Sequence, residues 1–211
     1  MIQMPGPAGV LELAIDLPAQ VPMGTAVIAH PHPLFGGTLH NKVVQTLARA
    51  CVQAGWRTVR FNFRGVGGSA GEHAHGVGEV DDLLAVIQAE AAEGPLVMGG
   101  FSFGAMVTAR AVHALHQPGS AAGLADATQR LRRLMLVGTA ASRFEVPAVP
   151  AHLHERTLVV HGEVDDTVSL ASVMDWARPQ HLPVTVVPGV EHFFHGQLPL
   201  LKSLALRHLH G

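Results

Sequence analysis

Two serines of this chain lie in the pattern Gly-x-Ser-x-Gly, which is typical of an exposed nucleophilic serine. Ser102 lies in "GFSFG" at 100–104, and Ser69 lies in "GGSAG" at 67–71. A serine hydroxyl becomes a strong nucleophile only when a neighbouring base removes its proton. The pattern by itself therefore leaves open which serine is a nucleophile, or whether either is.

The segments around the two serines favour Ser102. An apolar run, "PLVMGGF", precedes Ser102, and a segment with helical periodicity follows it at once. Such a strand, turn and helix hold a serine above the edge of a sheet, with the free N–H groups of the helix directed at it. Ser69 comes six residues after a strand that ends at Phe63, and no helix can begin before about Gly78. We therefore expect Ser102 to be the nucleophile and Ser69 to lie in a glycine-rich loop.

Acidic and histidine side chains follow two later apolar runs. The run at 157–162 is followed by "EVDD" at 163–166, and the run at 183–188 is followed by "GVEHFFH" at 189–195. A nucleophilic serine on an α/β sheet takes its acid and its histidine from such loops, in the chain order Ser, acid, His. His192 lies on the loop itself and is the expected base, whereas His195 is expected to orient the loop or to face outward.

Acyl transfer also needs two N–H donors where the carbonyl oxygen becomes negative. The N–H of Phe103, directly after the serine, is the first expected donor. The second is expected from the loop after the first buried strand, which reads "PHPLFGG". Pro31 and Pro33 have no N–H group, so His32 and Leu34 remain the two candidates.

Short apolar runs alternate with segments of helical periodicity, which indicates an α/β protein with a mostly parallel sheet. We expect one domain over 1–211, with helices on both faces of a sheet of seven or eight strands. The strands are expected at 10–17, 25–30, 57–63, 95–101, 133–139, 157–162 and 183–188, and the helices at 40–54, 79–92, 103–116, 168–178 and 197–209. The stretch 116–130 is expected to be a surface connection.

The composition excludes several classes of protein. The 211 residues are 48% hydrophobic and 14% charged, and the formal net charge is −2. No basic run is dense enough to bind nucleic acid, and no apolar run reaches the ~18 residues that cross a bilayer. We expect no membrane partner and a cytoplasmic location. Cys51, the only cysteine, excludes an internal disulfide and is expected in the core.

Five motifs together resemble the successive signatures of small bacterial serine hydrolases of the α/β hydrolase superfamily, a group similar to dienelactone hydrolases and short-chain esterases. The motifs are "HPHPLFGG", "RFNFRGVGGSAGEH", "GFSFGA", "HGEVDDTV" and "EHFFHG". The resemblance implies an eight-stranded sheet, with "MIQM" as an edge strand, and no cap domain over 140–156. It implies Ser102 as nucleophile, Asp165 as acid and His192 as base, with no metal or other cofactor. Asp166 is then expected to cap the helix that begins near Val168.

The function expected from these residues is hydrolysis of a small ester or thioester through an acyl-enzyme. We expect the acyl group of the substrate to be small and apolar, because apolar side chains lie near the site in the sequence: Leu34, Phe35, Phe193 and Phe194. Two alternatives stay open at this point. The first is a metal-dependent hydrolase that uses the "HPH" pair, His30 and His32, with acid and histidine ligands from the later loops. The second is a non-catalytic member of the fold that binds a small molecule or a partner.

Overall fold

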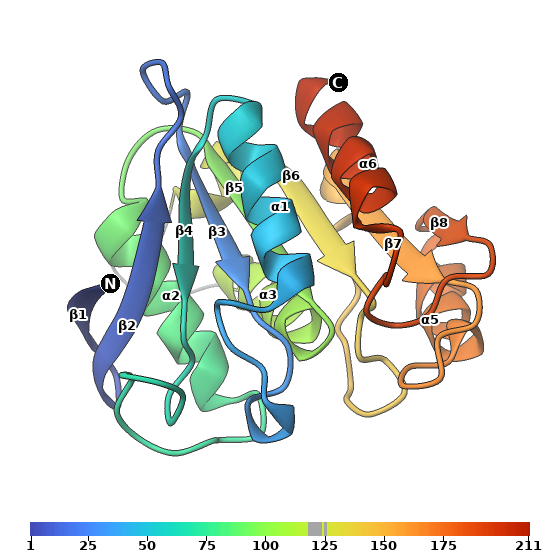
Figure 1. The fold of residues 1–211 in the computed structure, drawn as a ribbon, viewed down its shortest axis with the longest axis horizontal. Coiled ribbons are helices and arrows are strands. Elements are labelled where there is room, and N and C mark those ends of the chain that lie inside the picture. Colours follow the sequence, from blue (N-terminus) through green and yellow to red (C-terminus); the bar gives the residue numbers. More distant parts are fainter. Residues whose placement is uncertain (118–123, 125) are drawn as a thin grey trace.

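The computed structural model describes residues 1–117, 124 and 126–211. In this part of the chain, a sheet has eight strands in the order β1-β2-β4-β3-β5-β6-β7-β8 (Figure 1). The strands are β1 (Ile2–Gly6), β2 (Gly9–Asp16), β3 (Thr25–Ala29), β4 (Arg57–Phe61), β5 (Leu96–Phe101), β6 (Leu131–Val137), β7 (Thr157–Gly162) and β8 (Val184–Val187).

The mostly parallel α/β hydrolase sheet predicted from the sequence is confirmed. β1 pairs antiparallel with β2, and β2 pairs antiparallel with β4, whereas the remaining neighbours are parallel. The alternation in β2 buries Leu11 and Leu13, as expected for a strand with one covered face. Leu17, the last residue of the strand expected at 10–17, lies after the end of the strand and is 66% exposed.

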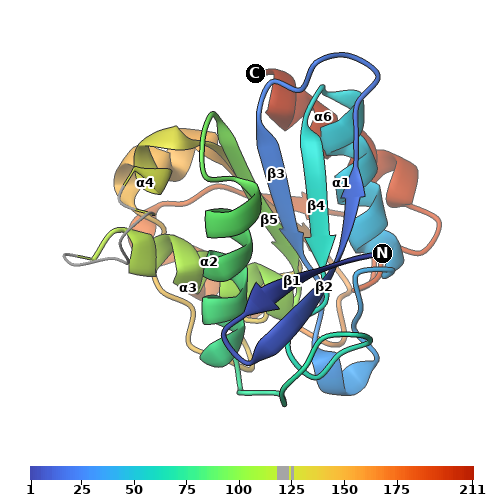
Figure 2. The same ribbon diagram turned by 90° about the vertical axis from the view of Figure 1, so that its left-hand side faces the viewer.

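Helices cover both faces of the sheet (Figures 1 and 2). One buried cluster joins Ile28 of the sheet to Val44 of α1 and Leu201 of α6. A second cluster, on the other face, joins Val27 to residues of α2, α3 and α5. The inner strands are therefore apolar on both faces. The helices are α1 (Lys42–Gln53), α2 (Gly78–Glu90), α3 (Phe103–Leu115), α4 (Ala127–Arg130), α5 (Leu170–Ala177) and α6 (Leu198–His210).

The link between β6 and β7 leaves the site uncovered. Its only helical segment is a 3-10 helix at Ala151–Arg156, so it forms no cap domain, as predicted. The surface connection predicted at 116–130 ends in α4, while 118–123 and 125 lie outside the described residues. Across the described ranges, no helix is long and apolar enough to cross a membrane.

Candidate active site

Ser102 occupies a tight turn between β5 and α3. Its backbone has φ 56° and ψ −116°, a conformation that costs about 1–3 kcal/mol for a residue with a side chain. The flanking glycines permit a close crossing of strand and helix: a Cβ on Gly100 would lie 2.3 Å from the Gly104 oxygen, and a Cβ on Gly104 would lie 2.5 Å from the Ala29 oxygen. The local sequence thus places Ser102 at the carboxyl edge of the sheet.

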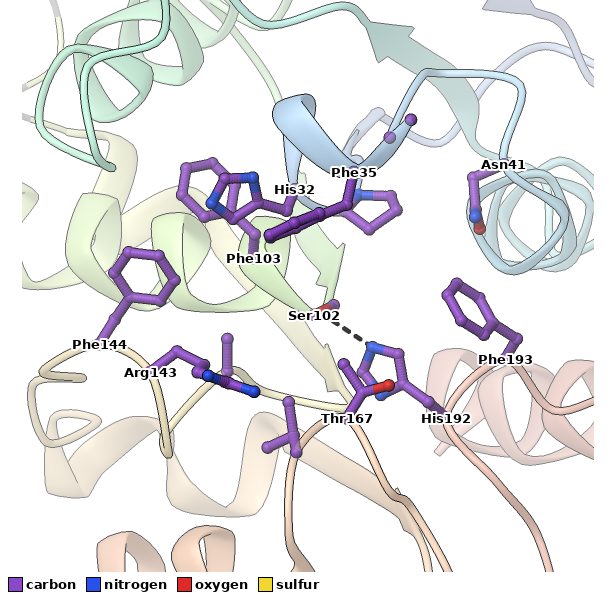
Figure 3. Close-up of a pocket in the computed structure, with 15 residues that line it drawn as sticks. His32, Phe35, Asn41, Ser102, Phe103, Arg143, Phe144, Thr167, His192 and Phe193 are labelled. Atoms are coloured by element: carbon purple, nitrogen blue, oxygen red, sulfur yellow. Dashed lines mark hydrogen bonds between the residues drawn. The ribbon is translucent and has the colours of Figure 1, made fainter.

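His192 lies between Ser102 and Asp165 in a chain of hydrogen bonds. Its Nε2 is 2.9 Å from Ser102 Oγ (Figure 3), and its Nδ1 is 2.6 Å from Asp165 Oδ2. All three residues are buried, with exposures of 2–7%. The parallel strands β5, β7 and β8 bring the loops that carry them to one edge of the sheet. The structure thus brings together the three side chains that the sequence places in these roles.

The Asp165 carboxylate is held in place by backbone groups. Its Oδ1 accepts hydrogen bonds from the N–H groups of Thr167 (2.9 Å) and Val168 (2.7 Å). Burial raises the pKa of Asp165, but the hydrogen bonds from His192 and Val168 outweigh it and leave the pKa below its usual value. The second oxygen is therefore fixed as a charged acceptor facing His192.

His161, which was given no role from the sequence, supports this carboxylate. Its Nε2 donates to the Val168 carbonyl at 2.9 Å and lies 3.4 Å from Asp165 Oδ2. Burial lowers the pKa of His161, which keeps its ring neutral near pH 7. The sequence feature that could have identified His161 is its place in "VVHG", at the carboxyl end of the strand that precedes the acid.

The capping role predicted for Asp166 is wrong. Helix α5 begins at Leu170, and its N-cap is Ser169, whose hydroxyl accepts from the N–H of Ser172. Asp166 is exposed, and its Oδ1 accepts instead from the Thr167 hydroxyl at 3.3 Å. The turn that Asp165 closes occupies the residues before the helix, so the helix begins later than the sequence suggests.

His195 and Ser69, the alternative base and the alternative nucleophile considered from the sequence, lie outside the chain of hydrogen bonds that joins Asp165, His192 and Ser102. The His195 side chain is 72% exposed, with its Nδ1 3.1 Å from Glu191. Ser69 donates from Oγ to the Asn62 carbonyl (2.7 Å) and accepts from the N–H of Glu12 (2.9 Å). Ser69 thus ties the glycine-rich loop to β2, with its hydroxyl engaged by the backbone.

Among the backbone N–H groups at the pocket that have no acceptor in the described residues, two lie where the donors to the carbonyl oxygen are expected. One is that of Phe103, the first residue of α3, and the other is that of His32, which lines the same pocket as Ser102. The N–H of Leu34 donates to His32 Nδ1 at 3.2 Å, and the Leu34 side chain is 67% exposed. Of the two expected second donors, only His32 has its N–H free for a ligand.

His30 cannot pair with His32 as a metal ligand in this arrangement. It is fully buried; its Nδ1 donates to the Pro31 carbonyl at 2.6 Å, and its Nε2 accepts from the N–H of Phe63 at 3.0 Å. Burial lowers the pKa of His30 to about 4. Within the described ranges, no three His, Cys, Asp or Glu side chains are arranged to hold a metal ion. His30 instead fixes the start of the loop that carries His32.

The pocket above Ser102 has a volume of about 660 Å³, and phenylalanine rings form part of its lining (Figure 3). Phe35 lies on one side of Ser102 and Phe193 on another, while Phe144 stands farther along the wall. Arg143 and Thr167 also line it; neither of them, nor Phe144, was predicted from the sequence. Their position after β6 and β7, at the same sheet edge, is the signal that could have found them.

A family model described as serine aminopeptidase, S33 matches residues 24–128. A lidless α/β serine hydrolase of Xanthomonas campestris is 36% identical, with a TM-score of 0.83, and the match covers 99% of this chain and 92% of that one. An α/β serine hydrolase homologue of Coxiella burnetii is 37% identical, with a TM-score of 0.79 and coverage of 99% and 96%.

A curated relative matches only in part. An uncharacterized protein of Rickettsia prowazekii is 42% identical over 91 residues, which are 41% of this chain and 38% of that protein. The two serine hydrolases, in contrast, align over nearly their full length. These two structures share both more than a third of their aligned residues and the fold with this chain. The chain therefore belongs to the α/β hydrolase superfamily, among the serine hydrolases without a lid.

Proposed function

We propose that this hydrolase cleaves a small ester or thioester through an acyl-enzyme on Ser102. The observation that carries the proposal is the unbroken chain of hydrogen bonds from Asp165 through His192 to the Ser102 hydroxyl, with distances of 2.6 and 2.9 Å. These separations lie within reach for proton transfer without rearrangement. The serine is also presented on a strained turn, as a nucleophile on this fold requires.

In the proposed reaction, His192 Nε2 takes the Ser102 proton while Oγ attacks the carbonyl carbon. The negative oxygen is stabilised by the N–H groups of Phe103 and His32. The alcohol or thiol then leaves with the proton from His192, and water releases the acid by the same steps in reverse. Asp165 keeps the His192 proton on Nδ1, so that Nε2 is free to act as the base.

The size and lining of the pocket support a small, apolar acyl part. Phe35, Phe103, Phe144 and Phe193 line the pocket, whereas Leu34 and Phe194, also expected there from the sequence, are not among its lining residues and Phe194 is buried in the core. Apolar walls bind apolar groups through burial. Neither a metal nor another cofactor takes part in the proposed reaction. The cytoplasmic location stays a prediction.

Labelling with a fluorophosphonate probe tests the proposal. The two serines in Gly-x-Ser-x-Gly patterns provide a matched pair: Ser102→Ala should abolish both labelling and ester turnover, whereas Ser69→Ala should keep both. Peptide mapping should find the adduct on Ser102. An adduct on Ser69, or full turnover by Ser102→Ala, contradicts the mechanism; a folded protein that neither labels nor turns over any ester supports a binding protein instead.

A panel of acyl esters and thioesters, varied in chain length, then defines the bond and the acyl group. We expect kcat/KM to fall once the acyl chain outgrows the pocket. A flat response to chain length would contradict the inference that the aromatic walls bind the acyl part.

A further inference from the structure

We infer that Arg143 forms an anion subsite in the pocket, so that the natural substrate is an ester or thioester carrying a carboxylate or a comparable anionic group. The inference rests on the proposed function, because it assigns a substrate class to the same site. It goes beyond that function in naming a charged part of the substrate, whereas the aromatic walls alone suggest an apolar one.

The position of Arg143 places a cation within reach of a bound substrate. The residue lies after β6, where its N–H donates to the Ala140 carbonyl at 3.2 Å. Its side chain lines the pocket and extends from its loop toward Thr167 and His192 (Figure 3). A substrate whose carbonyl lies at Ser102 can therefore direct another part toward the guanidinium.

Arg143 has no partner of its own within the described ranges: its guanidinium takes part in no ion pair or hydrogen bond there. Most other arginines are engaged. The guanidinium groups of Arg132 and Arg207 likewise have no partner within the described ranges, but neither residue lines the pocket. The arginines paired with carboxylates are Arg57, Arg60, Arg64, Arg130 and Arg178.

The pocket offers no negative charge to neutralise Arg143. Among the described residues that line it, none is Asp or Glu. The carboxylate of Asp165 is already engaged by His192 and two backbone N–H groups. An unneutralised guanidinium beside apolar rings attracts an anion, because the low-dielectric walls concentrate its field. Its planar donors match a carboxylate with two parallel hydrogen bonds.

The expected effect is moderate, because Arg143 is exposed to solvent. A charge-assisted hydrogen bond at a partly hydrated site should favour the anionic substrate by about tenfold. Part of this preference should fall as salt is added, since mobile ions screen an exposed charge.

Pairs of esters that differ in one charge test the subsite. On the acyl side, phenyl hemiglutarate is compared with phenyl pentanoate; on the alcohol side, 4-carboxyphenyl butyrate is compared with phenyl butyrate. In one of the two pairs, the unmodified protein should show about tenfold higher kcat/KM for the anionic ester. Arg143→Gln should remove this preference, Arg143→Lys should keep part of it, and Arg178→Gln, an exposed arginine outside the pocket, should leave it unchanged.

A binding measurement separates failure of the subsite from failure of the reaction. Calorimetry with Ser102→Ala should show tighter binding of the preferred anionic ester, and Ser102→Ala with Arg143→Gln should bind both members of the pair equally. Equal binding before the arginine is changed, or an anionic preference that survives Arg143→Gln, overturns the subsite. Absence of turnover and of Ser102 labelling overturns the proposed function, while the binding result still decides for or against the subsite.

Discussion

Substitution of Asp165 by Asn should leave the fold intact and remove most of the turnover. The carboxylate accepts from two backbone N–H groups through Oδ1 and from His192 through Oδ2. An asparagine has only one oxygen. With that oxygen facing the backbone donors, its NH₂ group faces His192 Nδ1 and holds the ring proton on Nε2, where the ring cannot accept the Ser102 proton. We expect kcat to fall by about 10³- to 10⁴-fold, as when other triads lose this carboxylate.

Asp166→Asn is the matched control, since it makes the same chemical change one residue away on an exposed side chain. Its kcat should stay within about twofold of the unmodified protein, and its thermal midpoint should barely move. Steady-state kinetics on one phenyl ester, with circular dichroism to verify folding, measures both variants. Near-normal kcat in a folded Asp165→Asn protein, or a strong loss in Asp166→Asn, would refute this reasoning.

Three further predictions follow from other sites. Ser102→Gly should be more stable than Ser102→Ala by about 1 kcal/mol in denaturant unfolding, because glycine adopts φ 56° without strain; equal stability would argue against a strained turn. Burial lowers the pKa values of His30 and His208 to about 4 in the folded protein, from 6.5. Their contribution to stability is therefore full above pH 6.5 and is lost as pH falls toward 4, by roughly 3 kcal/mol each, so His208→Gln should weaken the pH dependence of unfolding. Burial raises the pKa of the Cys51 thiol to about 12, and iodoacetamide should modify it only after denaturation; rapid modification of the native protein would contradict its burial.

Periodicity and local context predicted the elements of this protein well. Ser102 could be distinguished from Ser69 because a strand ends and a helix begins at that one position, a local property. The parallel strands likewise depend on short-range patterns, and the absence of a cap depends on the length of the link between strands, whereas the edge strand was expected from the family resemblance.

The details that sequence left open depend on contacts between distant loops or on competing hydrogen bonds. His32 and Leu34 both offered an N–H by composition, and only the bond from Leu34 to the His32 ring distinguishes them. Asp166 was misassigned because the turn closed by Asp165 delays the helix. Arg143 and Thr167 follow β6 and β7 at the same sheet edge, which the sequence indicates, but their entry into the pocket also depends on the tertiary arrangement of the two loops.

Detection of an acyl-enzyme tests the central claim most directly. The protein is mixed with a short-chain thioester or ester, quenched in acid and measured by intact mass and peptide mapping. We expect a mass increase equal to the acyl group, located on Ser102, which accumulates in Asp165→Asn when deacylation is slowed and is absent from Ser102→Ala. Turnover of the same ester that persists in Ser102→Ala, with no acyl group on this serine, would contradict the account.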